Sequence, residues 1–408
     1  MLNIIFFAYK CVSNLTKKMQ DKKLIIFGTP SIEKDEVNAV KNVLISKWIG
    51  SGPITEKFEK KFKEYKKSSY SLSLNSCTAG LHLSLKVLGI KVGDEVITTP
   101  LTFCSTINSI LLVGAKPVLV DINPLTLNID ENKIEKKISR KTKAIILVHF
   151  SGLPCNMGPI LKLARKYKIK IIEDCAHAIE SKYYNKHVGN FGETGCFSFY
   201  ATKNLTTGEG GMLITNKKRI SSRIKIMRLH GMTKDAWKRH LPEALTMKDR
   251  FQHYQVTELG LKYNMIDINS SLGLVQLKKI ERNWKIRKLI HQSYFNKLKH
   301  LPIIFQKINP YPVKYAYHLS IIRIDTTKTS KKRDHLIKFL LKNNIGVGVH
   351  YRSVTDLYYY KKYLGWNNNT CKIAKSVGDN ILSLPLFPSL KKNEVSYICN
   401  KVCEFFQK

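Results

Sequence analysis

Short apolar segments alternate with amphipathic segments along most of this chain. Residues 94–100, 143–152 and 169–175 are rich in apolar residues, whereas residues 32–46 and 157–168 have the spacing of a helix with one apolar side. Parallel strands covered on both faces are apolar almost throughout, and the helices that cover them are amphipathic. The alternation therefore predicts an α/β domain with a mostly parallel central sheet. In such sheets ligands bind beyond the carboxyl ends of the strands, so functional residues are expected there.

The pattern changes after about residue 275. A long helix is predicted through residues 272–301, followed by a strand at 318–325 and a final helix at 391–407. We expect a smaller α+β domain in this part, with a soft boundary because the long helix can bridge the two domains. The predicted organisation is an N-terminal extension, a large domain and a small domain, over residues 1–26, 27–275 and 276–408.

The N-terminal apolar run Leu2–Tyr9 is too short to span a bilayer. It also lacks the basic start and small-residue cleavage site of a signal peptide, so a ragged extension is favoured over a weak signal peptide. No later segment approaches the roughly 20 apolar residues of a membrane helix. The nine cysteines are odd in number and include no C-x-x-C pair, which argues against a disulfide framework and a zinc site. We therefore expect a cytoplasmic protein with no metal and no membrane partner.

The chain is strongly basic, because 69 Lys+Arg against 30 Asp+Glu give a formal net charge of +39. Such a charge usually suggests a nucleic-acid or membrane-surface partner. The lysines are spread over both halves of the chain, however, and no helix-turn-helix, zinc spacing or RNP-like aromatic motif accompanies them. The excess fits a composition shift toward AT-rich codons, and a charged face for an anionic partner is the alternative. No nucleic-acid partner is expected.

Two charged residues follow consecutive predicted strands. Asp174 ends the segment IKIIED, where a buried carboxylate is costly without a cationic partner. Lys203 lies beyond the next strand, in FSFYATKNLTTGEGG, near the hydroxyl of Ser198 and a pair of glycines. Pyridoxal phosphate (PLP) needs such groups, since a lysine amine binds its aldehyde as a Schiff base and a carboxylate keeps its pyridine nitrogen protonated. This ordered set suits a PLP site.

A third motif suits the phosphate of that cofactor. Residues 75–80 (NSCTAG) lie between a predicted strand and a predicted helix, so backbone N–H groups can point at an anion. Thr78 adds a hydroxyl, and the small Ala79 permits close approach. Taken alone, the motif is more typical of an ordinary helix N-cap. The motif precedes the segments of Asp174 and Lys203 in the chain, and the three together indicate a PLP site far more specifically than any one of them.

Together these motifs resemble those of the DegT/StrS family of PLP-dependent sugar aminotransferases, which have fold type I. The resemblance covers roughly residues 27–408. Within the family, the segments HLSIIRID (318–325) and HYR (350–352) are most similar to the UDP-4-amino-4-deoxy-L-arabinose–oxoglutarate aminotransferase branch. Further motifs that carry it are SKWIGSGP (46–53), residues 94–122, LKYNMIDINSSLGLVQL (261–277) and GVGVHYRSVTDLYYY (346–360).

The resemblance implies a role for each matching residue. Lys203 would bind the cofactor and move a proton, Asp174 would pair with the pyridine nitrogen, and His177 would lie beside the cofactor ring. The other implied cofactor contacts are Thr78, Ala79, Phe103, Ser198 and Asn264, the last reaching over from the second subunit of a homodimer. The implied substrate-binding residues are His350, Tyr351 and Arg352.

Some of these residues also suit purely structural roles. His177 and Phe103 could be packing residues, Ser198 could satisfy the local backbone, and His350 fits packing about as well as binding. Cys77 stands where the family often has Ala or Gly, and a thiol is small enough to change cofactor affinity little. The chain keeps Lys203 where dehydratase relatives carry His, which favours transamination.

The resemblance implies transfer of the amino group of L-glutamate to a nucleotide-linked 4-keto sugar, UDP-linked in the arabinose branch. The products would be 2-oxoglutarate and an amino sugar for cell-envelope polysaccharide or for lipid A, where it would be associated with polymyxin resistance. A 6-deoxy-4-keto hexose or a 3-keto sugar is the alternative substrate. A non-catalytic regulator with the same fold is a further alternative, which the retained Lys203 and Asp174 disfavour.

Overall fold

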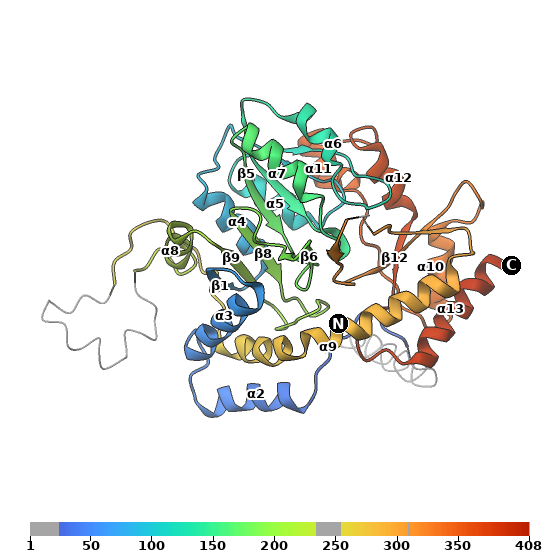
Figure 1. Cartoon of the computed structure of the whole chain (residues 1–408), viewed down its shortest axis with the longest axis horizontal. Coiled ribbons are helices and arrows are strands. Elements are labelled where there is room, and N and C mark those ends of the chain that lie inside the picture. The colour runs from blue at the N-terminus through green and yellow to red at the C-terminus, as the bar shows by residue number, and fades with distance from the viewer. Residues whose placement is uncertain (1–23, 234–253, 309–310, 408) are drawn as a thin grey trace, which may run out of the picture.

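The computed structural model describes residues 24–233, 254–308 and 311–407 (Figure 1). The apolar run Leu2–Tyr9 and most of the predicted N-terminal extension lie outside the described residues. Within the described ranges, no helix is both long enough and apolar enough to cross a membrane.

A seven-stranded sheet forms the centre of the molecule, in the order β1-β9-β8-β5-β4-β2-β3. Strand β9 is antiparallel to both of its neighbours, and the other pairs are parallel. The predicted mostly parallel α/β sheet is therefore confirmed. The strands are β1 (Tyr70–Leu74), β2 (Glu95–Thr98), β3 (Lys116–Leu119), β4 (Thr142–Val148), β5 (Lys170–Asp174), β8 (Thr194–Ser198) and β9 (Gly211–Thr215).

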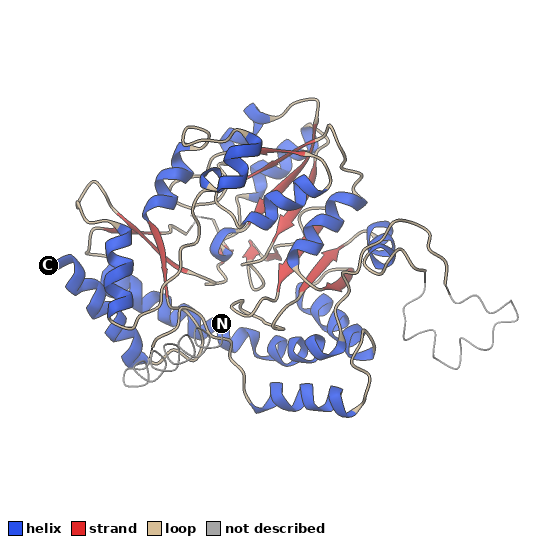
Figure 2. Cartoon of the chain, turned by 180° about the vertical axis from the view of Figure 1, so that it is seen from behind, coloured by secondary structure: helices blue, strands red, loops and turns tan. Residues whose placement is uncertain are grey.

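Helices cover both faces of this sheet (Figure 2). Successive strand residues point to opposite faces, so Ile146 packs toward α4 (Cys77–Val87) and α8 (Lys218–Met227). Its neighbour Ile145 packs toward α7 (Met157–Lys166) on the other face. Burial on both sides explains why the central strands are apolar with little alternation.

The N-terminal helices α2 (Lys34–Ile45) and α3 (Pro53–Lys66) lie against α9 (Asp267–Leu298). Phe58 and Phe62 of α3 pack into the cluster of rings beneath β8 and β9. Helix α3 begins with its proline at the first position, where a missing N–H costs nothing. Its other N-terminal N–H groups are accepted by Asp267, which fastens α3 to the start of α9.

The C-terminal part contains a three-stranded antiparallel sheet of β10 (Ile303–Phe305), β12 (Ser320–Ile324) and β13 (Ile381–Leu384). Helices α10 (Arg333–Lys342) and α13 (Lys392–Gln407) enclose its apolar core. The remaining elements are α5 (Cys104–Leu112), α6 (Glu131–Ile134), β6 (Lys182–Tyr183), β7 (Lys186–His187), β11 (Val313–Lys314), α11 (Tyr358–Leu364) and α12 (Lys372–Asn380).

Helix α9 joins the two parts of the molecule. It contacts α2 and α3 at one end and α13 at the other, as Figure 1 shows. The predicted boundary at residue 275 falls inside this continuous helix of 32 residues. Ile25, which we assigned to the extension, pairs with residues 344–346 and packs in the C-terminal core. The division into domains therefore stays a prediction.

Candidate active site

A cavity of about 460 Å³ opens at the carboxyl edge of the central sheet. Parallel strands end at the same edge, so residues far apart in the sequence meet there. The end of β5 contributes Asp174, the end of β8 contributes Ser198, and the first turn of α4 contributes Thr78. The other predicted site residues that line this cavity are Phe103, His177, Lys203, His350 and Tyr351.

Lys203 lies in the loop between β8 and β9, where its backbone N–H donates to the carbonyl oxygen of Tyr200 at 2.9 Å. Burial lowers the pKa of its amine to about 8, against the opposing influence of Cys77 and Asp174. A primary amine must be uncharged to attack a carbonyl carbon. At neutral pH roughly a tenth of the amine is therefore ready to react.

Asp174 is a buried carboxylate, 4% exposed, at the end of β5. Its Oδ2 accepts the hydroxyl proton of Thr106 at 2.9 Å, and its Oδ1 accepts the N–H of Ala176 at 3.1 Å. Burial nevertheless raises its pKa above the ordinary value. The two hydrogen bonds therefore do not fully offset the cost of burying the carboxylate charge, and a cation beside Asp174 would offset the rest. The protonated pyridine nitrogen of PLP is such a cation.

The first turn of α4 suits the phosphate group. Ser76 caps the helix by accepting the N–H of Ala79 at 3.1 Å. The N–H groups of Cys77 and Thr78 have no acceptor among the described residues, and both residues line the cavity. Gly211 backs this turn, where a Cβ would come within 2.4 Å of the Ser76 carbonyl carbon. Amine, carboxylate and anion cradle thus fit PLP.

His177 is held in one tautomer. Its Nδ1 accepts the backbone N–H of Ser151 at 3.2 Å, so Nδ1 carries no proton. Burial, with Lys203 nearby, holds the pKa of His177 well below its ordinary value, and the ring is neutral. Its proton is therefore on Nε2 and is donated to the hydroxyl oxygen of Tyr351 at 3.1 Å.

Phe103 is 58% exposed where it lines the cavity, so it is not a core residue. The Ser198 hydroxyl lines the cavity and also accepts the Tyr200 N–H at 3.4 Å. His350 stacks on Phe27 with ring centroids 4.9 Å apart and bonds Ser383 through Nδ1.

Three predicted residues do not line the cavity of their own chain. Ala79 is buried, and its N–H is already taken by Ser76. Arg352 is largely exposed and lies 3.9 Å from Asp356. The side-chain oxygen of Asn264 is buried without a hydrogen-bond partner among the described residues.

Several residues of the site were not predicted. Thr106 and Ser76 support Asp174 and the anion cradle, and both stand in motifs that the sequence already singled out. A hydroxyl one helical turn into α5 and an N-cap serine were the available signals. Phe27, Tyr200 and His318 also line the cavity. Tyr200 and His318 stand in the motifs FSFYATKNLTTGEGG and HLSIIRID, but neither motif had assigned them a role.

A buried cluster of His149, Glu173 and Cys175 lies behind the site. The Nε2 of His149 is 3.0 Å from Glu173, whose carboxylate also accepts the N–H groups of Gly189, Phe191 and Gly192. The Nδ1 of His149 accepts the N–H of Cys155 at 3.1 Å. Both ring nitrogens of His149 and the carboxylate of Glu173 are thus used in hydrogen bonds near the strand ends.

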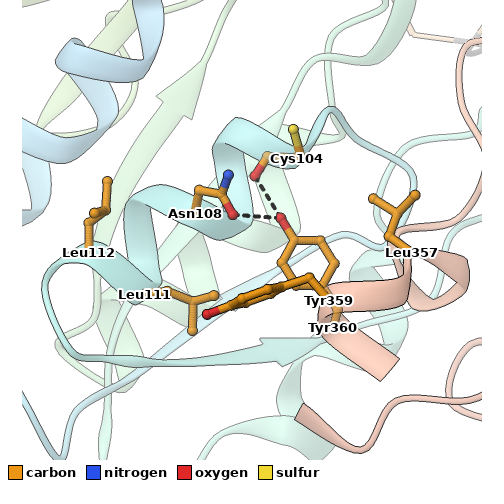
Figure 3. A pocket seen from close by; sticks show the side chains of 7 residues that line it. All are labelled: Cys104, Asn108, Leu111, Leu112, Leu357, Tyr359 and Tyr360. Carbon is orange, nitrogen blue, oxygen red and sulfur yellow. Dashed lines mark hydrogen bonds between the residues drawn. The ribbon is translucent and has the colours of Figure 1, made fainter. Parts of the chain in front are cut away.

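A second hollow, of about 590 Å³, lies between α5 and α11 (Figure 3). Its floor is closed by Tyr360, whose hydroxyl donates to Asn108 at 2.7 Å. The other lining residues are Cys104, Leu111, Leu112, Leu357 and Tyr359. No amine or carboxylate is among them, so this hollow cannot supply the groups that PLP requires.

The sequence and the structure both match known proteins. Residues 30–403 match the DegT/DnrJ/EryC1/StrS aminotransferase family. The spore coat polysaccharide biosynthesis protein SpsC of Bacillus subtilis is 38% identical over 92% of this chain and 95% of its own.

Solved structures of aminotransferases share the fold, and two of them serve as examples. The PLP form of the sugar aminotransferase Spr1654 of Streptococcus pneumoniae superposes with a TM-score of 0.85, at 30% identity over 94% of this chain and 98% of its own. PseC of Helicobacter pylori, an aminotransferase of pseudoaminic acid biosynthesis, gives 0.86 at 30% identity over 94% of this chain and 100% of its own. The chain belongs to the DegT/DnrJ/EryC1/StrS aminotransferase family and is a PLP-dependent aminotransferase of fold type I.

Proposed function

We propose that this enzyme transfers the amino group of L-glutamate to the keto carbon of a nucleotide-linked 4-keto sugar, with UDP as the nucleotide. The observation that carries the proposal is that Lys203 and Asp174 face one cavity beside an anion-binding helix turn. The names of PseC and SpsC support a sugar substrate and a polysaccharide or related glycan as the destination. We place the amino sugar in a cell-envelope polysaccharide or in lipid A, and the enzyme in the cytoplasm.

PLP supplies an electron sink that stabilises negative charge at the substrate carbon. The chain's own residues do the rest. Lys203 provides an amine that binds the cofactor and moves a proton at the reacting carbon, because its lowered pKa leaves part of it uncharged. Asp174 would keep the pyridine nitrogen protonated, from a position fixed by Thr106 and Ala176. The first turn of α4 would hold the phosphate group.

The direct test is mass spectrometry of the products formed from ¹⁵N-labelled L-glutamate and a panel of UDP- and dTDP-linked keto sugars. The panel includes the UDP-linked 4-keto pentose of the arabinose branch, a 6-deoxy-4-keto hexose and a 3-keto sugar. A ¹⁵N-labelled amino sugar from a UDP-linked 4-keto member is expected. Labelling of a 3-keto or dTDP-linked sugar alone would assign a different substrate, and unconsumed glutamate would contradict the choice of donor.

We also propose a homodimer with shared active sites, in which Asn264 reaches the cofactor phosphate of the partner. Its side chain is outside its own cavity and only weakly bonded, since its Nδ2 lies 3.5 Å from the Met265 carbonyl oxygen. Its Oδ1 is buried without a partner among the described residues. Because a phosphate only accepts hydrogen bonds, the Nδ2–H group of Asn264 would make the contact, and its present bond to Met265 is weak enough to be given up.

Subunit mixing tests this arrangement. Lys203→Ala and Asn264→Ala proteins, each weak alone at limiting PLP, are expected to recover about one quarter of wild-type activity after subunit exchange. A two-fold symmetric dimer gives that fraction because half of the dimers are mixed and each mixed dimer has one intact site. The measurement is the transaminase activity of the mixed proteins, compared with that of each variant alone. If Asn264 serves its own chain, mixing restores nothing.

A further inference from the structure

His318 lies two residues before β12 and lines the cofactor cavity, and the motif HLSIIRID, which it begins, had given it no role. Its ring is 7% exposed and stacks beside His177, with ring centroids 4.4 Å apart. The β12 strand belongs to the C-terminal sheet, so this histidine brings a polar group from the second part of the chain to the cavity.

The orientation of Asn204 decides which nitrogen of His318 carries the proton. The Nδ2 of Asn204 donates to Glu180 at 2.9 Å and to the carbonyl oxygen of Ala316 at 3.0 Å. Both partners can only accept, so the Oδ1 of Asn204 faces the Nδ1 of His318, at 3.1 Å. An amide oxygen can only accept, and the Nδ1 of His318 must therefore be the donor.

Burial, with Lys203 nearby, holds the pKa of His318 well below its ordinary value, so the ring carries one proton. With that proton on Nδ1, the Nε2 of His318 presents a lone pair. Among the described residues no protein group donates to it. The acceptor is thus available to a ligand in the cavity.

A buried ion pair supports this arrangement from behind. Arg287 of α9 bonds the carboxylate of Glu180, and both side chains are almost wholly excluded from solvent. Both carboxylate oxygens of Glu180 in turn accept from the Nδ2 group of Asn204. An acceptor and a donor that are held rigidly lose little entropy when a ligand binds. Arg287, Glu180 and Asn204 therefore act as positioning residues for His318.

Tyr351 supplies the opposite kind of group. Its oxygen accepts the Nε2–H of His177, so its own hydroxyl proton is free to be donated into the cavity. Burial raises the pKa of Tyr351, which keeps the hydroxyl protonated. Two neutral groups, an acceptor on His318 and a donor on Tyr351, thus flank His177 on the cavity wall.

We infer that His318 is a sugar-positioning residue, whose Nε2 accepts the proton of a ring hydroxyl while Tyr351 donates to an oxygen of the same sugar. This inference rests on the proposed keto-sugar substrate. A neutral acceptor and donor match an uncharged sugar ring, whereas a dicarboxylate such as glutamate is better matched by cations.

Two variants separate the hydroxyl contact from the packing of the ring. His318→Asn keeps a polar group near Asn204 but has no atom at the Nε2 position, whereas His318→Gln places its amide there. Each half-reaction is followed separately through the visible band of lysine-bound PLP, which disappears with L-glutamate and returns with the keto sugar identified from the panel.

For His318→Asn we expect the kcat/KM of the sugar half-reaction to fall about tenfold, mainly through KM, as one lost hydrogen bond implies. The glutamate half-reaction should stay within about twofold, and His318→Gln should recover most of the loss. An unchanged sugar half-reaction, or equal slowing of both halves, would overturn the inference. If wild-type protein reacts with glutamate but with no sugar of the panel, the proposed function itself fails.

A measurement on the wild-type protein avoids any folding defect of the variants. Long-range ¹H–¹⁵N correlation spectra of ¹⁵N-histidine-labelled holoenzyme report the tautomer of each ring. His318 is expected to carry its proton on Nδ1 and His177 on Nε2, with the His318 signals assigned by their absence from His318→Gln. A proton on the Nε2 of His318 would remove the acceptor and overturn the inference.

Discussion

Lys203→Ala is expected to lower the transamination rate at least about 10⁴-fold, because both the covalent attachment of PLP and proton transfer at the substrate carbon are lost. The same change should abolish the visible absorbance band of lysine-bound PLP in the purified protein. Because burial lowers the pKa of Lys203 to about 8, capture of PLP by the wild-type apoprotein should speed up as the pH rises toward 8 and then level off.

Lys66 offers a matched control. It is also a buried lysine whose pKa burial lowers to about 8, but its amine donates to the carbonyl oxygen of Ile179 and does not line the cavity. Lys66→Met should lower the thermal unfolding temperature and keep the visible band. A band that survives in Lys203→Ala, or that disappears in Lys66→Met while the protein is folded, would show that the wrong lysine was assigned.

Asp174→Asn is expected to lower kcat about 10²- to 10⁴-fold while PLP remains covalently bound. The amide keeps the shape of the carboxylate but cannot hold a positive charge on the pyridine nitrogen, so the electron sink is weakened. Single-turnover kinetics with L-glutamate measures the effect. Thr106→Val is the graded comparison, because it removes one hydrogen bond to Asp174 and should cost about tenfold.

The Asp174→Asn substitution should not destabilise the apoprotein. Burial raises the pKa of Asp174 in the folded state, so ionisation at neutral pH opposes folding, and a neutral side chain relieves that opposition. We expect an equal or higher unfolding temperature for Asp174→Asn near pH 7. The difference should vanish as the pH falls below the ordinary pKa of an aspartate, where Asp174 is neutral in both the folded and the unfolded protein. A clearly lower unfolding temperature near pH 7 would mean that Asp174 is a structural carboxylate.

Local patterns of the sequence sufficed to predict the large sheet and the residues at its edge. The strands that end at Asp174 and Ser198 are apolar because both faces are covered, and a parallel sheet brings their ends together. Helix caps and hydroxyls near strand ends are equally local signals. For this reason the sequence alone points to Lys203, Asp174 and Thr78 as site residues.

Other features depend on contacts between distant segments. The periodicity of the sequence does not locate the start of α9. The helix begins at Asp267, whose side chain accepts hydrogen bonds from the distant N-terminus of α3. The role of His318 depends on Asn204 and Glu180, which approach it only when the two parts of the chain pack together. Arg352 matched a motif, yet its side chain is largely exposed outside the cavity and directed toward the buried Asp356.

The sequence by itself determined the fold class and the cofactor chemistry, and it predicts which lysine and which carboxylate hold the cofactor, because strand ends and helix caps are encoded by neighbouring residues. The formal net charge of +39 is a further feature of the sequence, and the described residues that line the cavity do not account for it. Only the tertiary structure decided which groups share one cavity and which nitrogen of His177 or His318 carries a proton. A tautomer is set by the partners that surround a ring, and those partners come from segments that meet only in the folded chain.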